Sequence, residues 1–131
     1  MIDEIHVPGW PMPKGYANGR IAGGRTVHVG GQIGWSPAGV FEATDFVGQF
    51  AQTLDNVIAV VRAAGGQADD IASMTVFVTD MNAYRAARKQ IAPLWRDRFG
   101  TYYPAMALVA VTELFEPQAL VEIQAIAHVL P

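Results

Sequence analysis

The sequence has no cysteine, few charged residues and no long apolar run. The absence of cysteine among the 131 residues excludes disulfides, cysteine-ligated zinc and a thiol nucleophile. This composition is typical of a cytoplasmic protein, and we expect that location. The longest charge-free apolar stretch, about residues 100–112, contains a proline and is shorter than the roughly 18 residues of a membrane-spanning helix. The segment Met1-Ile-Asp-Glu lacks the apolar run of a secretory signal peptide. We therefore expect no membrane contact.

Charged residues make up only 16% of the chain, and the net charge is −3. Nucleic-acid binding needs several cations in one place, so we do not expect this acidic chain to bind nucleic acid.

Apolar residues make up 51%, enough for one domain over residues 1–131 with a sizeable core. Because a small domain leaves much of its surface exposed, the mean hydropathy of +0.20 predicts a homo-oligomer with apolar subunit contacts. The three histidines show no metal-ligand spacing, and we expect no metal.

Proline, glycine and the spacing of apolar residues predict the secondary structure. Residues 1–14 contain three of the eight prolines and are predicted to form an irregular arm. Alternating or β-branched residues predict strands at five places, with a Gly23-Gly24 turn between the first two: 20–22, 25–34, 71–80, 105–112 and 119–129. Helical spacing predicts a helix over 44–64, with Thr44 or Asp45 as its N-cap and Gly65-Gly66 at its end.

A second helix is predicted from an Asn82 cap to Phe99, with Pro93 kinking it or ending it early. Two helices among antiparallel strands predict an α+β fold, with both helices on one face of a mixed sheet. On the last strand, alternation assigns Val121 and Ile123 to the helix-packed face and Glu122 to the opposite face. A carboxylate among apolar neighbours on an oligomer interface is costly to bury without a partner, which makes Glu122 a candidate functional residue.

Six short, largely apolar motifs follow one another along the chain: Gly15-Tyr16, Val29-Gly30-Gly31-Gln32-Ile33, Thr53-Leu54-Asp55-Asn56-Val57, Thr75-Val76-Phe77-Val78-Thr79-Asp80-Met81, Pro104-Ala105 and Val121-Glu122-Ile123-Gln124-Ala125-Ile126-Ala127. In this order, from about Lys14 to Ala127, they resemble the Rid family, also called the YjgF or L-PSP endoribonuclease family.

The resemblance implies a chorismate-mutase-like α+β fold and a homotrimer, in which three sheets form a closed barrel with ligand clefts between subunits. It also implies an enamine or imine deaminase that hydrolyses 2-aminoacrylate-type intermediates to 2-keto acids and ammonia, without metal or cofactor. The implied site comprises Glu122, which orients or activates water, and the substrate-binding positions Tyr16, Gly30, Gly31, Met106 and Leu108.

The chain departs from the family pattern after Pro104-Ala105, where the founding branch has an arginine that grips the substrate carboxylate. Met106 stands at that position, and Gly30 replaces a family serine. A charge-assisted bond of this kind contributes about 1.5–3 kcal/mol, so its loss weakens binding on the order of ten- to a hundredfold. We therefore expect poor activity on 2-aminoacrylate and a ligand that is larger, flatter or less anionic. Arg88 on the second helix would restore a cation if it approaches the cleft, and Trp35 would add an apolar wall if its loop does.

Each candidate residue also has a structural interpretation. The alternative role of Glu122 is to pair with a basic residue across the subunit interface, and that of Tyr16 is to pack the arm. The Gly30-Gly31 pair would also allow close strand packing. For the whole protein, the alternatives to a hydrolase are a non-catalytic binder of small apolar metabolites and, more remotely, an endoribonuclease. The ribonuclease reading would use the basic residues of the second helix, which otherwise form a solvated face.

Overall fold

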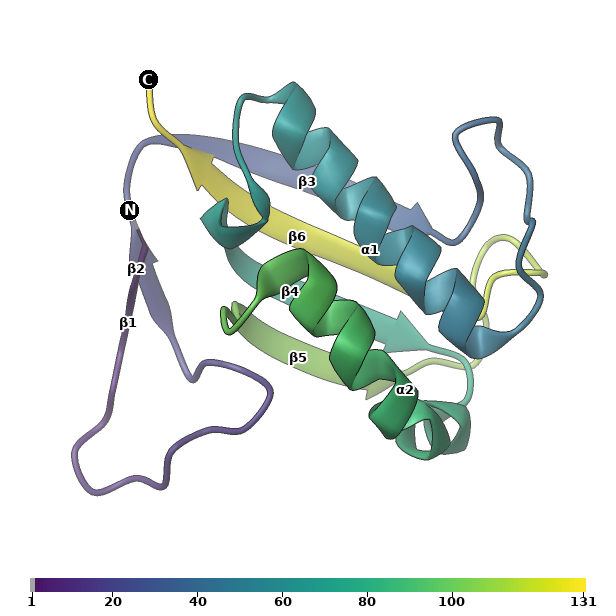
Figure 1. Ribbon diagram of the computed structural model, residues 1–131, viewed down its shortest axis with the longest axis horizontal. Helices are drawn as coiled ribbons and strands as arrows, with labels where there is room; N and C mark the ends of the chain where they lie inside the picture. Colours follow the sequence, from purple (N-terminus) through teal and green to yellow (C-terminus); the bar gives the residue numbers. More distant parts are fainter. Residues whose placement is uncertain (1) are drawn as a thin grey trace.

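The long periodic segment forms the first helix, α1 (Phe46–Ala63), in the computed structural model, which describes residues 2–131 (Figure 1). Met1, included in the predicted domain and arm, lies outside the described residues. Asp45 caps the helix, and its carboxylate accepts a hydrogen bond from the Gly48 backbone N–H at 3.1 Å. Gly65 then adopts a φ of 92°, which a glycine tolerates and which ends the helix as predicted.

The second helix, α2 (Met81–Phe99), begins earlier than predicted and ends at Phe99. Asp80, and not Asn82, is the N-cap: its carboxylate accepts from the backbone N–H groups of Asn82 at 2.9 Å and Ala83 at 3.2 Å. The helix continues through Pro93 to Phe99, so of the two alternatives predicted at the proline, a kink or an early end, the early end does not occur. Trp95 and Phe99, both buried beyond the proline, stack with ring centroids 4.0 Å apart, and this packing stabilises the last turns.

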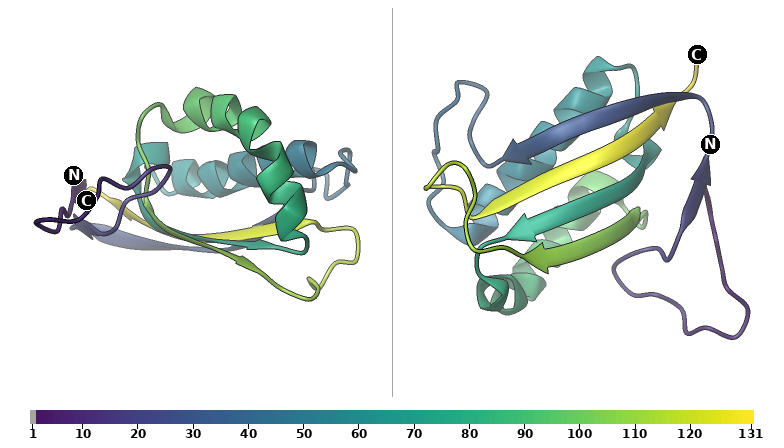
Figure 2. Two further views of the ribbon diagram at one scale, coloured as in Figure 1. Left: turned by 90° about the horizontal axis from the view of Figure 1, so that it is seen from below. Right: turned by 180° about the vertical axis from the view of Figure 1, so that it is seen from behind.

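Four strands form the main sheet in the order β3-β6-β4-β5. Their bounds are Arg25–Ile33 for β3, Ile71–Val78 for β4, Ala105–Ala110 for β5 and Val121–Val129 for β6, and a short 3₁₀ helix, η1 (Ala68–Asp70), precedes β4. The β4–β5 pair is parallel because α2 carries the chain back between them, and the other pairs are antiparallel. Both helices cover one face of this mixed sheet (Figure 2, left), which confirms the predicted α+β architecture.

The N-terminal segment forms its own small sheet, which the sequence did not predict. Strand β2 (Arg20–Ala22) pairs antiparallel with β1 (Ile2–Glu4) and not with β3, so the predicted hairpin around Gly23-Gly24 is wrong. Part of the predicted irregular arm is therefore a strand. A Cβ at Gly24, whose φ is 108°, would meet the Val129 carbonyl oxygen at 2.5 Å. This glycine lets the chain pass close to β6 and redirects it, instead of closing a hairpin.

The core lies between the helices and the sheet, and β6 shows the alternation most clearly. Val121, Ile123 and the later odd-numbered residues of β6 are buried under the helices, as predicted. Glu122 and the other even-numbered residues point to the opposite face, which no element of residues 2–131 covers (Figure 2, right). We call this surface the open face. Neither helix in the described part of the chain combines the length and apolar character needed to cross a bilayer.

Candidate functional site

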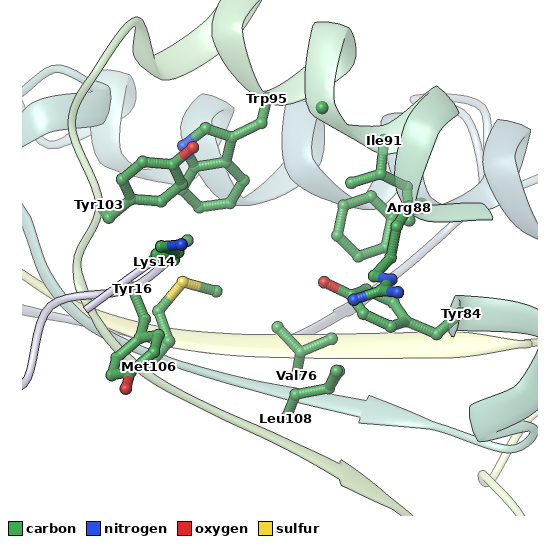
Figure 3. Close-up of a pocket in the computed structure, with 13 residues that line it drawn as sticks. Lys14, Tyr16, Val76, Tyr84, Arg88, Ile91, Trp95, Tyr103, Met106 and Leu108 are labelled. Carbon is green, nitrogen blue, oxygen red and sulfur yellow. The ribbon is translucent and has the colours of Figure 1, made fainter. Parts of the chain in front are cut away.

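A pocket of about 430 Å³ opens between α2 and the edge of the sheet (Figure 3). Its floor comes from Val76 on β4 and from Met106 and Leu108 on β5. Strands β4 and β5 run parallel in register, which places Met106 beside Met74 and Leu108 beside Val76. Met74 is buried under the helices, so its neighbour and the pair two residues further along face the helices as well. The volume lies within the range of about 300–1,000 Å³ that small-molecule sites occupy.

Stacked aromatic rings form one wall of the pocket. Trp95 stacks on Tyr103, with ring centroids 5.3 Å apart and planes 7° from parallel. The indole N–H of Trp95 donates a hydrogen bond to the Tyr102 carbonyl oxygen at 2.9 Å, which fixes the indole ring. Because Phe99 also stacks on Trp95, the wall is rigid and apolar.

The segment before β2 closes the open edge of the pocket. The Ala17 N–H donates to the Pro104 carbonyl oxygen at 3.0 Å, so this segment lies beside the start of β5. The Arg20 guanidinium donates to the Tyr103 carbonyl oxygen at 2.6 and 3.0 Å, which gives a second attachment. These bonds hold Lys14 and Tyr16 at the pocket, although 43% of the Tyr16 surface stays exposed.

A cation and a phenol line the pocket from α2. Arg88 and Tyr84 lie one helical turn apart, so their side chains share a face of α2. Arg88 extends toward the sheet beside Tyr84 (Figure 3). Burial raises the pKa of the Tyr84 phenol above its usual value, and the nearby Arg88 charge opposes that rise. Within residues 2–131, no hydrogen bond or ion pair engages the Arg88 guanidinium.

Glu122 lies on the open face, away from the pocket. In β6 it pairs in register with Ile33 of β3 and Phe77 of β4, and its side chain is partly buried. The β3–β6 register shifts between Val29 and Gln32, and a Cβ at Gly31 would overlap the Glu122 carboxylate. The side chain of Glu122 therefore lies over Gly31, at the irregular part of β3.

Within one chain, the predicted site residues fall into two separate groups. Tyr16, Met106 and Leu108 meet at the pocket, on the helix side of the sheet. Gly30, Gly31 and Glu122 are on the open face or its edge and do not line that pocket. A single chain does not bring the predicted site together, because the sheet lies between the two groups.

The sequence also raised the question of whether Arg88 and Trp35 approach the ligand. Arg88 reaches the pocket, whereas Trp35 does not line it and packs its ring 5.9 Å from that of Phe41. Tyr84, Trp95 and Tyr103 line the pocket as well and are not among the site residues expected from the sequence. The aromatic spacing on α2 and the tyrosine before Pro104 were the available signals. In the described part of the chain, no three side chains of the histidine, aspartate or glutamate type gather into a possible metal site.

Comparisons with known proteins agree with this fold over nearly the whole chain. The family model described as endoribonuclease L-PSP matches residues 11–129. A RutC family protein of Haemophilus influenzae is 34% identical over 127 residues, covering 97% of each chain. The 2-iminobutanoate/2-iminopropanoate deaminase of Escherichia coli is 35% identical over 104 residues, covering 79% of this chain and 80% of the enzyme.

Solved structures show the same similarity in three dimensions. The YjgF gene product of Escherichia coli matches with a TM-score of 0.71 and 32% identity, covering 96% of this chain and 98% of that protein. A protein of the conserved Rid family from Yersinia pestis, YyfB, matches with a TM-score of 0.82 and 25% identity, covering 98% of each chain.

Proposed function

Because the chain belongs to the endoribonuclease L-PSP family, which includes the Rid and YjgF proteins, we propose that it hydrolyses a small reactive imine or enamine in the cytoplasm. Water adds to the carbon of the C=N bond, ammonia leaves, and a 2-keto acid remains. Glu122 accepts a proton from the attacking water and returns one to the departing nitrogen. An enamine first takes a proton on carbon to become the imine. The similarity to the Escherichia coli 2-iminobutanoate/2-iminopropanoate deaminase supports this reaction most directly.

The proposed reaction requires more than one copy of the chain. Glu122 and the pocket are on opposite faces of the sheet, so Glu122 of one subunit would act on a ligand in the pocket of the next. We propose a homotrimer in which the open faces line a closed barrel and each pocket lies in a cleft beside the next subunit. Apolar side chains support this assembly, since Phe77, Ile126 and Val109 lie on the open face and 40% of Val109 is exposed.

The pocket also limits the substrate. Met106 supplies a soft apolar contact where the founding branch of the family has its carboxylate-binding arginine. We therefore expect 2-aminoacrylate, which relies on that arginine, to be a poor substrate, and bulkier imines to be better ones.

Turnover and assembly test the proposal separately. An amino-acid oxidase would generate imines in the presence of the purified protein. The rate of their conversion to keto acids would be compared with the rate without the protein. Glu122→Gln should reduce this acceleration by about 10²–10⁴-fold. Glu42→Gln, which changes an exposed carboxylate in the loop before α1, should leave it unchanged. Light scattering should give three times the 14.1 kDa chain mass. A monomer, or full activity in Glu122→Gln, would overturn the proposal.

A second candidate function is binding without catalysis. The apolar floor of the pocket favours it, because a site without the founding branch's arginine can still hold an apolar metabolite. Saturable ligand binding with no acceleration of hydrolysis for any imine would establish this function instead. Ribonuclease activity, which the family description names, would be assayed with the same preparations.

A further inference from the structure

We propose that the pocket binds an aromatic 2-imino or 2-keto acid, with Arg88 holding the carboxylate and the Trp95–Tyr103 wall packing against the ring. The inference depends on the proposed function only for the reaction that follows binding. In this arrangement Arg88 on α2 takes the role of the arginine that the founding branch carries at the position of Met106.

The carboxylate is assigned to Arg88 because its guanidinium is available at the pocket. It extends toward the floor beside Tyr84 (Figure 3), and no protein group in the described part of the chain neutralises it. A guanidinium donates two parallel hydrogen bonds to a carboxylate, and such bonds are stronger than neutral ones. The Tyr84 phenol, beside Arg88, is placed to donate a further hydrogen bond to the same group.

The ring is assigned to the other end of the pocket, where the surroundings are apolar and flat. Tyr103 stacks on Trp95 there, and the Met106 thioether lies on the floor below (Figure 3). Aromatic rings stack favourably in offset or edge-to-face arrangements, and a thioether sulfur makes favourable contacts with a ring. A planar hydrocarbon group therefore suits this end better than a polar one.

The spacing of the two ends favours a one-ring acid over a three-carbon acid. Leu108 and Val76 separate Arg88 from Met106 along the floor, so a ligand must span the apolar floor to contact both ends. A three-carbon acid held by Arg88 would leave the aromatic wall in contact with water and gain nothing from it. In a 2-imino acid the C=N carbon is bonded to the carboxylate carbon, so Arg88 also fixes where the proposed water attacks.

Equilibrium binding to the assembled protein tests the inference without requiring turnover. Calorimetry would compare phenylpyruvate with pyruvate, which has no ring, and phenylacetone, which has no carboxylate. The wild-type protein should bind phenylpyruvate about tenfold or more tightly than either. Arg88→Gln should weaken phenylpyruvate binding by about 10- to 100-fold and leave phenylacetone binding unchanged. Arg88→Lys, which keeps the charge and loses the fork, should lie between.

Lys89→Gln is the matched control, because it removes one positive charge from the next, exposed residue of α2 outside the pocket. It should bind all three probes like the wild type. Circular dichroism would confirm folding, and Arg88→Lys decides the result if Arg88→Gln is unfolded. Equal binding of pyruvate and phenylpyruvate, no saturable phenylpyruvate binding, or an equal loss in Lys89→Gln would overturn the inference.

Hydrolysis assays separate this inference from the proposed function. Arg88-dependent binding of phenylpyruvate without acceleration of imine hydrolysis would refute the proposed function and support the inference. Glu122-dependent hydrolysis that is insensitive to Arg88 and to the ring would support the proposed function and refute the inference.

Discussion

Replacing Gly31 by alanine should impair hydrolysis far more than it changes stability. Gly31 is not among the residues with positive φ, so its backbone accepts alanine. A Cβ there would lie 2.8 Å from the carboxyl carbon of Glu122. Because non-bonded carbon atoms pack at about 3.5–4.0 Å, the carboxyl group must move by about 1 Å.

The two consequences of this movement differ greatly in size. Moving a flexible carboxylate away from its preferred rotamer costs about 0.5–1.5 kcal/mol, and replacing glycine by alanine recovers about 0.4–1 kcal/mol through the unfolded chain. The free energy of unfolding should therefore change by no more than about 1 kcal/mol. Misplacing a catalytic group by about 1 Å can reduce a rate about a hundredfold. The expected result is a large fall in kcat with a nearly unchanged Tm.

Keto-acid release from an imine generated in situ would be measured beside thermal unfolding and light scattering. Gly23→Ala is the matched control, since no atom lies within 4 Å of a Cβ at Gly23 and its φ is not positive. Gly23→Ala should keep the wild-type rate. Wild-type kcat in a folded, correctly assembled Gly31→Ala protein would refute the idea that Gly31 sets the position of Glu122.

Three further perturbations test the fold and the pocket. Gln49→Ala should lower the free energy of unfolding in urea by about 2–4 kcal/mol, because the buried amide makes three hydrogen bonds that bind α1 to the loops at Ala43 and before β6. An equal loss in the partly buried Gln52→Ala would contradict that reason. Met106→Arg should tighten the binding of pyruvate, a carboxylate without a ring, by about tenfold or more, and unchanged affinity would show that this side chain does not reach the ligand. Burial raises the pKa of the Tyr102 phenol from 10.0 to about 12, so its contribution to stability is complete below pH 10 and is lost as the pH rises through 12. Tyr102→Phe should therefore flatten the fall in Tm across this range, and an identical fall in the variant would refute the assignment.

The secondary structure was predictable wherever one periodicity dominated a segment. Residues 44–64 bury every third or fourth side chain, and this spacing fits a helix. The alternation in β6 similarly assigned Val121 and Glu122 to opposite faces. The pairing of residues 20–22 was not predictable in the same way. A strand of three residues can pair with any exposed edge, and the close approach of Gly24 to Val129 decided against the hairpin.

The pocket depended on contacts that local patterns do not describe. Tyr84 and Trp95 occupy helix positions typical of core packing, and burial alone cannot distinguish a core face from a pocket wall. The parallel return of β5 beside β4 places Met106 opposite that helix face. The sequence left open whether Arg88 approaches the cleft, and the exposed Arg88 comes to line the pocket through the packing of α2 over β5.

The sequence by itself determined the helices, the faces of the strands and the family. Each of these depends on residue identity and on spacing within a short segment, which backbone geometry converts directly into structure. Only the tertiary structure decided which residues share a pocket and which side of the sheet Glu122 occupies relative to that pocket. Those relations depend on strand order and crossover, which join segments far apart in the chain and leave no periodic trace within any one of them.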